Sequence, residues 1–160
     1  MKKKYLEKFY NNTLTYTQYK VFSLSLPITL LHKSMFNDTE QFLKENYDLL
    51  HSHLDVLATL YFNDNALSPT ELYDATVFSS GGMTKVLKKL EDREYITRCP
   101  SQEDKRSLLV CITPLGMKIV EDALEQIVIS KEKIFNILTN KEQESLNKIL
   151  EKLTRSLYKG

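Results

Sequence analysis

The stretch LSPTELYDATVFSSGGMTKVLKKLEDREYITRCPSQEDKRSLLVCITPLG, residues 67–116, carries most of the signals that decide the fold. It opens with a strong helix-start signal, because Ser68 can cap a helix, Pro69 suits the first helical position and Glu71 completes a capping box. The sequence therefore predicts a short helix that begins at Pro69 and stops by about Thr76.

The next segment has the spacing of an amphipathic helix. Apolar residues recur every three or four positions, and they are Met83, Val86, Leu87 and Leu90. Thr84, Lys85 and Lys88 lie off this apolar face. We predict a helix from Ser80 to Arg93.

The periodicity then changes from helical to extended. Residues 95–98 and 108–113 are typical of strands, and the polar segment 100–107 between them predicts a projecting hairpin loop. The predicted order is therefore two helices joined by a short turn and then a hairpin, which is the order of a winged helix-turn-helix.

Helices are expected on both sides of this lobe. Apolar spacing predicts a helix from about Ser25 to Asn46 and another from His51 to Phe62. Thr113-Pro114 restarts a long helix, and Thr139 with Glu142 forms a second capping box before a final one. The fold class is therefore mainly α with a small β-hairpin wing.

The domain organisation follows from these elements. We expect a basic aromatic arm over 1–24, a winged helix-turn-helix lobe over 51–114, and a helical dimerisation region from 25–50 and 115–160. The apolar stripes of the flanking helices exceed what the small lobe can cover. We therefore predict that they pack between two copies of the chain, although a private helical core is the alternative.

Composition and charge narrow the class of protein. Charged residues make up 27% of the chain and hydrophobic residues 42%, with a net charge of +1, which predicts a soluble globular protein. The basic excess lies in residues 1–20 and 79–106. We expect a cytoplasmic protein, since no segment has the pattern of a signal peptide or a membrane helix.

Candidate DNA contacts lie on the second helix of the pair and on the hairpin. A major groove admits one helix, and free N–H groups at a helix N-terminus favour phosphate. A projecting Arg can enter a narrow minor groove, and a neighbouring carboxylate can orient it. The candidates are Ser79, Ser80, Gly81, Thr84, Lys85, Lys88, Arg98, Asp104, Lys105 and Arg106.

These motifs together resemble the MarR family of regulators. The resemblance rests on LSPTEL at 67–72, SSGGMTK at 79–85, Leu90-Glu91, Asp104-Lys105-Arg106, Leu109-Val110 and ITPLG at 112–116. It implies a homodimer that binds a pseudo-palindromic operator on double-stranded DNA, usually as a repressor. Such proteins often respond to a small aromatic ligand or to oxidation.

The sequence departs from the family pattern at three places, and one of them is the long aromatic arm that precedes the first helix. Family members usually have a Gly in the turn after the recognition helix, where this chain has Glu94. Their wing often has two Arg where this chain has Lys105-Arg106. The modest net charge also keeps open an alternative function, namely a winged-helix module that binds protein or a ligand without binding an operator.

Other chemistries have weaker signals. Cys99 and Cys111 flank the wing, where we expect ordinary half-buried thiols, with a redox switch as the alternative. His51, His53 and Asp55 do not have the spacing of a metal site on one helix face, so a capping or packing role is expected. The sequence contains no nucleophile elbow, phosphate loop or metalloprotease motif, and we expect neither an enzyme nor a cofactor.

Overall fold

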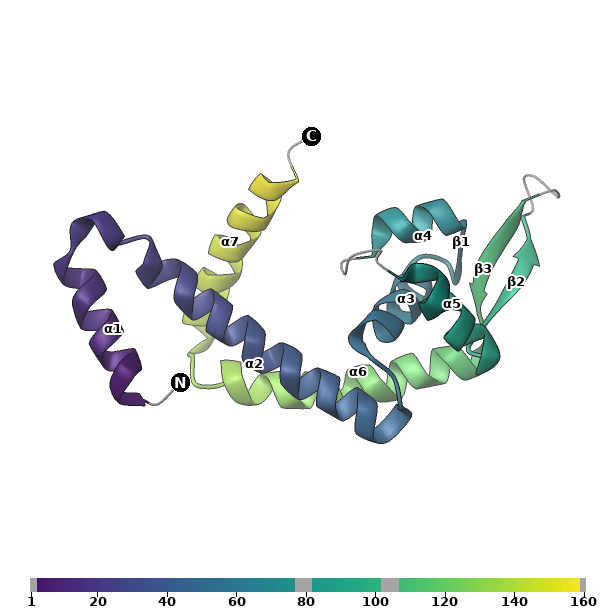
Figure 1. The fold of residues 1–160 in the computed structure, drawn as a ribbon, viewed down its shortest axis with the longest axis horizontal. Helices are drawn as coiled ribbons and strands as arrows, with labels where there is room; N and C mark the ends of the chain where they lie inside the picture. Colours follow the sequence, from purple (N-terminus) through teal and green to yellow (C-terminus); the bar gives the residue numbers. More distant parts are fainter. Residues whose placement is uncertain (1–2, 77–81, 102–106, 159–160) are drawn as a thin grey trace. The chain divides into compact units, whose positions relative to one another are not determined.

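A computed structural model describes residues 3–76, 82–101 and 107–158. Its elements are α1 (Lys3–Thr15), the 3-10 helix η1 (Thr17–Tyr19), α2 (Phe22–Tyr47), α3 (His51–Phe62), β1 (Ala66–Leu67), α4 (Pro69–Ala75), α5 (Met83–Asp92), β2 (Ile96–Pro100), β3 (Leu108–Ile112), α6 (Pro114–Phe135) and α7 (Asn140–Leu157) (Figure 1). The mainly helical class with a small hairpin is as predicted. Within the described ranges, no helix has the length and apolar character needed to cross a membrane.

The chain divides into two compact units, residues 1–51 and 52–160. In the first unit, the stretch expected to be an arm forms α1 and η1. Helix α2 begins at Phe22, so the predicted start near Ser25 is wrong. The Ser25 amide already donates to the Val21 carbonyl at 3.0 Å, so a helical turn closes before Pro27, which lies inside the helix.

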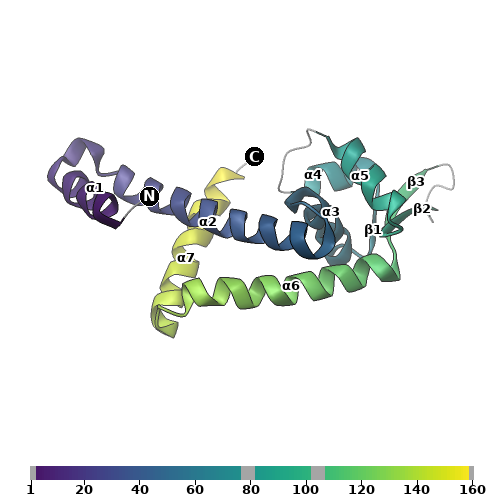
Figure 2. The ribbon, with the colours of Figure 1, turned by 60° about the horizontal axis from the view of Figure 1, so that its bottom comes forward.

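The second unit contains the sheet and the helices around it. The strand order is β1-β3-β2, and both pairings are antiparallel. The sequence predicted the β2–β3 hairpin but missed β1, because two residues are too few to show a period. Helix α3 donates a hydrogen bond from Tyr61 Oη to Glu121 of α6 at 2.9 Å, and Figure 2 shows α6 passing beside α3. This bond raises the pKa of Tyr61 above its usual value.

Helix α5 is shorter than predicted. It begins at Met83 rather than at Ser80, because its N-cap Gly82 has a φ of 109°. An L side chain rarely adopts such a φ, so this glycine provides the turn that starts the helix. The helix ends at Asp92, one residue before the predicted end at Arg93.

A hydrogen-bonded joint holds the base of the hairpin to the start of α6. The Thr113 hydroxyl donates to the Glu94 carbonyl at 2.7 Å and accepts from the Gly116 amide at 3.0 Å. The Thr113 amide donates to the Tyr95 carbonyl at 3.0 Å. Gly116 is buried, and a Cβ there would collide with the Tyr95 oxygen and lie 2.8 Å from Ile112 Cγ1. We call Glu94, Tyr95, Thr113 and Gly116 the hairpin joint.

We predict that Gly116→Ala lowers the free energy of unfolding by about 1–3 kcal/mol, because backbone atoms cannot yield to the added methyl group as a flexible side chain would. Asp122→Ala, at an exposed position of the same helix, is the control and should change stability little. Urea unfolding followed by circular dichroism measures both. Equal stability of Gly116→Ala and the wild type would contradict the close packing at the joint.

Candidate nucleic-acid interface

Helix α4 is built as the sequence predicts. Ser68 caps it, because the Glu71 amide donates to Ser68 Oγ at 3.2 Å and the Ser68 amide donates to Glu71 Oε2 at 2.9 Å. Hydrogen bonding of the Glu71 carboxyl by the Ser68 hydroxyl, and to a smaller extent by the Ser68 amide, lowers the pKa of this carboxyl. Leu72 is fully buried and anchors the helix. Helix α4 therefore has a defined start, and it precedes α5 along the chain.

Helix α5 presents two different faces. Leu87 and Leu90 are buried, with exposed fractions of 7% and 0%. Thr84, Lys85 and Lys88 are exposed. A buried apolar face fixes the rotation of the helix about its axis, so the hydroxyl and the two ammonium groups must point away from the core. We call these three residues the outer face of α5.

The two long strands form a wing whose inner face belongs to the core. Ile96, Val110 and Ile112 are buried. Their register is Ile96 opposite Ile112 and Arg98 opposite Val110. Arg98 thus lies on the same strand face as Ile96, because side chains two residues apart point to the same side. This orientation directs its long side chain back toward α5.

An ion pair joins the wing to α5. Arg98 Nε donates to Glu91 Oε1 at 2.6 Å, and the two side chains retain 35% and 34% of their exposure. A charge-assisted hydrogen bond of this length constrains the angle between the helix and the strand. Sequence reasoning proposed Arg98 only as a DNA contact and gave Glu91 no role. The sequence did contain a signal for this pair, because Glu91 and Arg98 carry opposite charges and lie seven residues apart across a predicted helix-to-strand turn.

Glu94 has a left-handed backbone at the turn between α5 and β2, with a φ of 58°. This explains why glycine suits the position, since glycine adopts such a φ without steric cost. The chain keeps the turn geometry despite the larger residue. The hydrogen bond from Thr113 to the Glu94 carbonyl helps to hold it.

The structure describes some of the predicted site residues and not others. Thr84, Lys85 and Lys88 lie together on α5, and Arg98 lies on β2. The other predicted residues lie outside the described residues, and they are Ser79, Ser80, Gly81, Asp104, Lys105 and Arg106. Their contacts with DNA remain predictions.

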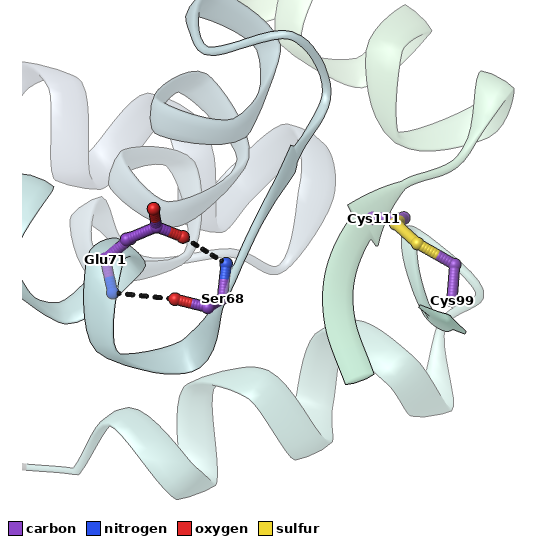
Figure 3. The surroundings of a disulfide bond; sticks show 4 residues. All are labelled: Ser68, Glu71, Cys99 and Cys111. Atoms are coloured by element: carbon purple, nitrogen blue, oxygen red, sulfur yellow. Dashed lines mark hydrogen bonds between the residues drawn. A yellow bond between two sulfur atoms is a disulfide. The ribbon is translucent and has the colours of Figure 1, made fainter. Parts of the chain in front are cut away.

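The two cysteines correct the sequence-based expectation of ordinary thiols. Cys99 and Cys111 form a disulfide across β2 and β3 (Figure 3). The sequence shows only that twelve positions separate them, whereas the strand register brings them together. His51 packs as expected, with its ring stacked on Phe36 at 4.1 Å between centroids. Among the described residues, no group of three or more His, Cys, Asp or Glu is arranged to hold a metal ion.

A capped short helix, a second helix with an exposed polar face, and a two-stranded wing are the parts of a winged helix-turn-helix. Their order along the chain is α4, α5, β2 and β3, with β1 completing the sheet. The protein is therefore of the winged helix-turn-helix class.

Comparison with known proteins identifies the family. A family model described as MarR family matches residues 47–107. SarZ of Staphylococcus aureus (strain USA300), an HTH-type transcriptional regulator, is 30% identical over 117 residues, which cover 73% of this chain and 77% of SarZ. The chain belongs to the MarR family, and it is a transcriptional regulator.

Solved structures share the fold at lower identity. A MarR mutant from E. coli complexed with operator DNA is 24% identical with a TM-score of 0.68, and the match covers 84% of this chain and 95% of that one. MepR, a regulator of the Staphylococcus aureus efflux pump MepA, is 21% identical with a TM-score of 0.66 over 83% and 97% of the two chains.

We predict that the Glu91–Arg98 pair contributes a coupling free energy of about 0.5 kcal/mol, because both side chains are partly exposed and water screens their attraction. A double-mutant cycle of Glu91→Gln and Arg98→Gln, followed by urea unfolding, measures it. The same cycle with Glu91→Gln and Lys148→Gln of α7 is the control and should be additive. Additivity in the first cycle as well would show that the pair does not tie the wing to α5.

Proposed function

We propose that the protein is a cytoplasmic, sequence-specific DNA-binding regulator without catalytic activity, and that it acts as a homodimeric repressor relieved by a small aromatic ligand. The observation that carries the DNA-binding part is helix α5, whose apolar side is buried while its outer face is exposed. Repression and relief by a ligand are supported by family membership.

The outer face of α5 has the chemistry for a major groove. Thr84 offers a hydroxyl and a methyl group to base edges, while Lys85 and Lys88 offer donors to guanine or to phosphate. The preceding residues Ser79, Ser80 and Gly81 would meet the sugar-phosphate backbone near the start of this helix. Helix α4 would brace it from the side.

The wing would extend the contact beyond the major groove. In this proposal Arg106 enters the adjacent minor groove, Asp104 orients it, and Lys105 pairs with phosphate. Arg98 lies nearer the base of the wing and would add charge beside the DNA backbone while Glu91 holds its Nε atom.

Helix α7 supports the assignment of a homodimer. None of its residues is buried in the single chain. Its apolar side chains follow one stripe, which comprises Leu146, Ile149, Leu150, Leu153 and Leu157. The stripe borders two open hollows of about 570 and 250 Å³ that share Leu146. A second copy could cover this stripe with its own, as in an isologous interface. We call these five residues the α7 stripe.

We predict that Lys85→Ala and Lys88→Ala each weaken binding to an operator about tenfold and reduce the salt dependence of binding by about one ion, because each removes a positive contact. The operator is first selected from a random DNA pool, and affinity is then measured by fluorescence anisotropy at several salt concentrations. Lys118→Ala, which removes an exposed charge from α6, is the matched control and should bind normally.

Selection of no preferred sequence, or full affinity in both lysine variants, would contradict the regulator proposal. The protein-interaction or ligand-binding module would then account for the fold. A symmetric selected site would in addition support binding by a two-fold dimer, since half-site spacing reflects protein symmetry.

We predict that Leu153→Glu converts the dimer to a monomer at micromolar concentration, because it places a charge in the middle of the α7 stripe. Lys152→Glu, at the neighbouring exposed position, is the matched control and should remain dimeric. Sedimentation velocity distinguishes the two species. A wild-type protein that sediments as a monomer would refute the dimer.

A further inference from the structure

The cysteine pair occupies a defined place in the sheet. Cys99 of β2 lies opposite Leu109, and Cys111 of β3 lies opposite Thr97. The two cysteines are therefore diagonal neighbours on one face of the hairpin. Their Cα atoms are 6.3 Å apart and their sulfurs are bonded. Separations of about 4.4–6.8 Å are usual for disulfides, so the strand register itself brings the two side chains within bonding reach.

The cysteines lie on the outer face of the wing. Ile96, Val110 and Ile112 are buried on the opposite face. Cys99 and Cys111 are half-buried, and Thr97, which lies opposite Cys111 on the same face, is exposed. Dissolved oxidants and thiols can therefore reach the sulfurs, whereas cysteines in the hydrophobic core would be protected.

The disulfide lies within the wing, and one of its cysteines belongs to the strand that pairs with β1. Cys111 lies opposite Ala66 of β1, and β1 leads directly into Ser68, the cap of α4. Figure 3 shows the disulfide on the hairpin and the Ser68–Glu71 capping box at the start of α4. The bond also closes a covalent ring, because twelve positions separate the two cysteines and the tip of the wing lies between them.

We propose that Cys99 and Cys111 form a reversible dithiol–disulfide site that hydroperoxides oxidise and small thiols reduce, and that the disulfide stiffens the wing for DNA binding. The effect on DNA rests on the function proposed above. In a reducing cytoplasm disulfides are rare, and those that form are mostly transient and redox-sensing. In this proposal the two cysteines are thiols in the reducing cytoplasm and form the disulfide when a hydroperoxide is present.

The reaction balances within the pair and the peroxide. With hydrogen peroxide, one thiolate attacks a peroxide oxygen, which forms an S–O bond, breaks the O–O bond and releases water after protonation. The second thiolate attacks the resulting sulfenic sulfur, which forms the S–S bond, breaks the S–O bond and releases a second water. The sulfurs together lose two electrons and the peroxide gains them. Two small thiols reverse the reaction by disulfide exchange.

Oxidation strengthens DNA binding in this proposal. The disulfide coexists with all five residue pairs of the β2–β3 ladder, so its formation does not require the wing to unpair. A cross-link removes conformations from the free wing, and a binding element that is already ordered loses less entropy when it docks. The disulfide therefore acts as a stiffener of the wing rather than as a release switch.

The test compares the reduced full-length protein with the same protein oxidised by hydrogen peroxide. We expect oxidation to remove two hydrogens from the intact mass and to block both thiols against maleimide. Amide hydrogen exchange in residues 96–100 and 108–112 should become slower. Affinity for the selected operator should rise about threefold. Cys99→Ser and Cys111→Ser should each bind like reduced wild type and show no redox effect.

Three results would overturn the inference: an unchanged mass, cross-links between chains on a non-reducing gel, or a disulfide that changes neither hydrogen exchange nor operator affinity. Failure of the proposed function is distinguishable from these. Absence of operator binding in both redox states would refute the regulator, whereas the mass and the hydrogen exchange of the wing would still decide whether the cysteine pair is a redox site.

Discussion

The hairpin joint is the constraint on which the rest of the second unit depends. Thr113 satisfies the carbonyl of Glu94 with its hydroxyl and that of Tyr95 with its amide, while its hydroxyl oxygen caps α6 at Gly116. Three elements, namely the exit from α5, the base of the wing and the start of α6, thus share one small cluster of hydrogen bonds. A shift of one element against the others would therefore break at least one of these hydrogen bonds.

The joint makes α5 and the wing a single surface. Helix α5 is held at its end by the left-handed turn at Glu94, and the Glu91–Arg98 pair ties it to β2. Buried Leu90 and Ile96 fix the inner sides of both elements. The outward side chains therefore keep a constant spacing, which a protein needs if it is to distinguish one DNA sequence from another by several contacts at once.

The same division between inner and outer faces recurs along the chain, with different consequences. On α5 the outer face is polar, which suits a nucleic acid. On the wing it contains two half-buried sulfurs, which suits redox chemistry. Helix α7 differs, because none of its residues is buried and its apolar stripe is left for a second copy to cover. The proposals for α5 and the wing thus follow from what each element exposes once its other face has been used for packing, and the proposal for α7 follows from an exposed apolar stripe.

Local signals were enough to predict much of this protein. The capping boxes at Ser68 and Thr139 and the apolar spacing in α3 and α5 depend on neighbours within a few residues, so the sequence alone determined these helices and the order of a winged helix-turn-helix. Only tertiary structure decided the rest. Strand β1, the Glu91–Arg98 pair and the Cys99–Cys111 bond each join segments whose proximity depends on strand register and helix packing. No local pattern encodes that proximity, because it arises when the whole core assembles.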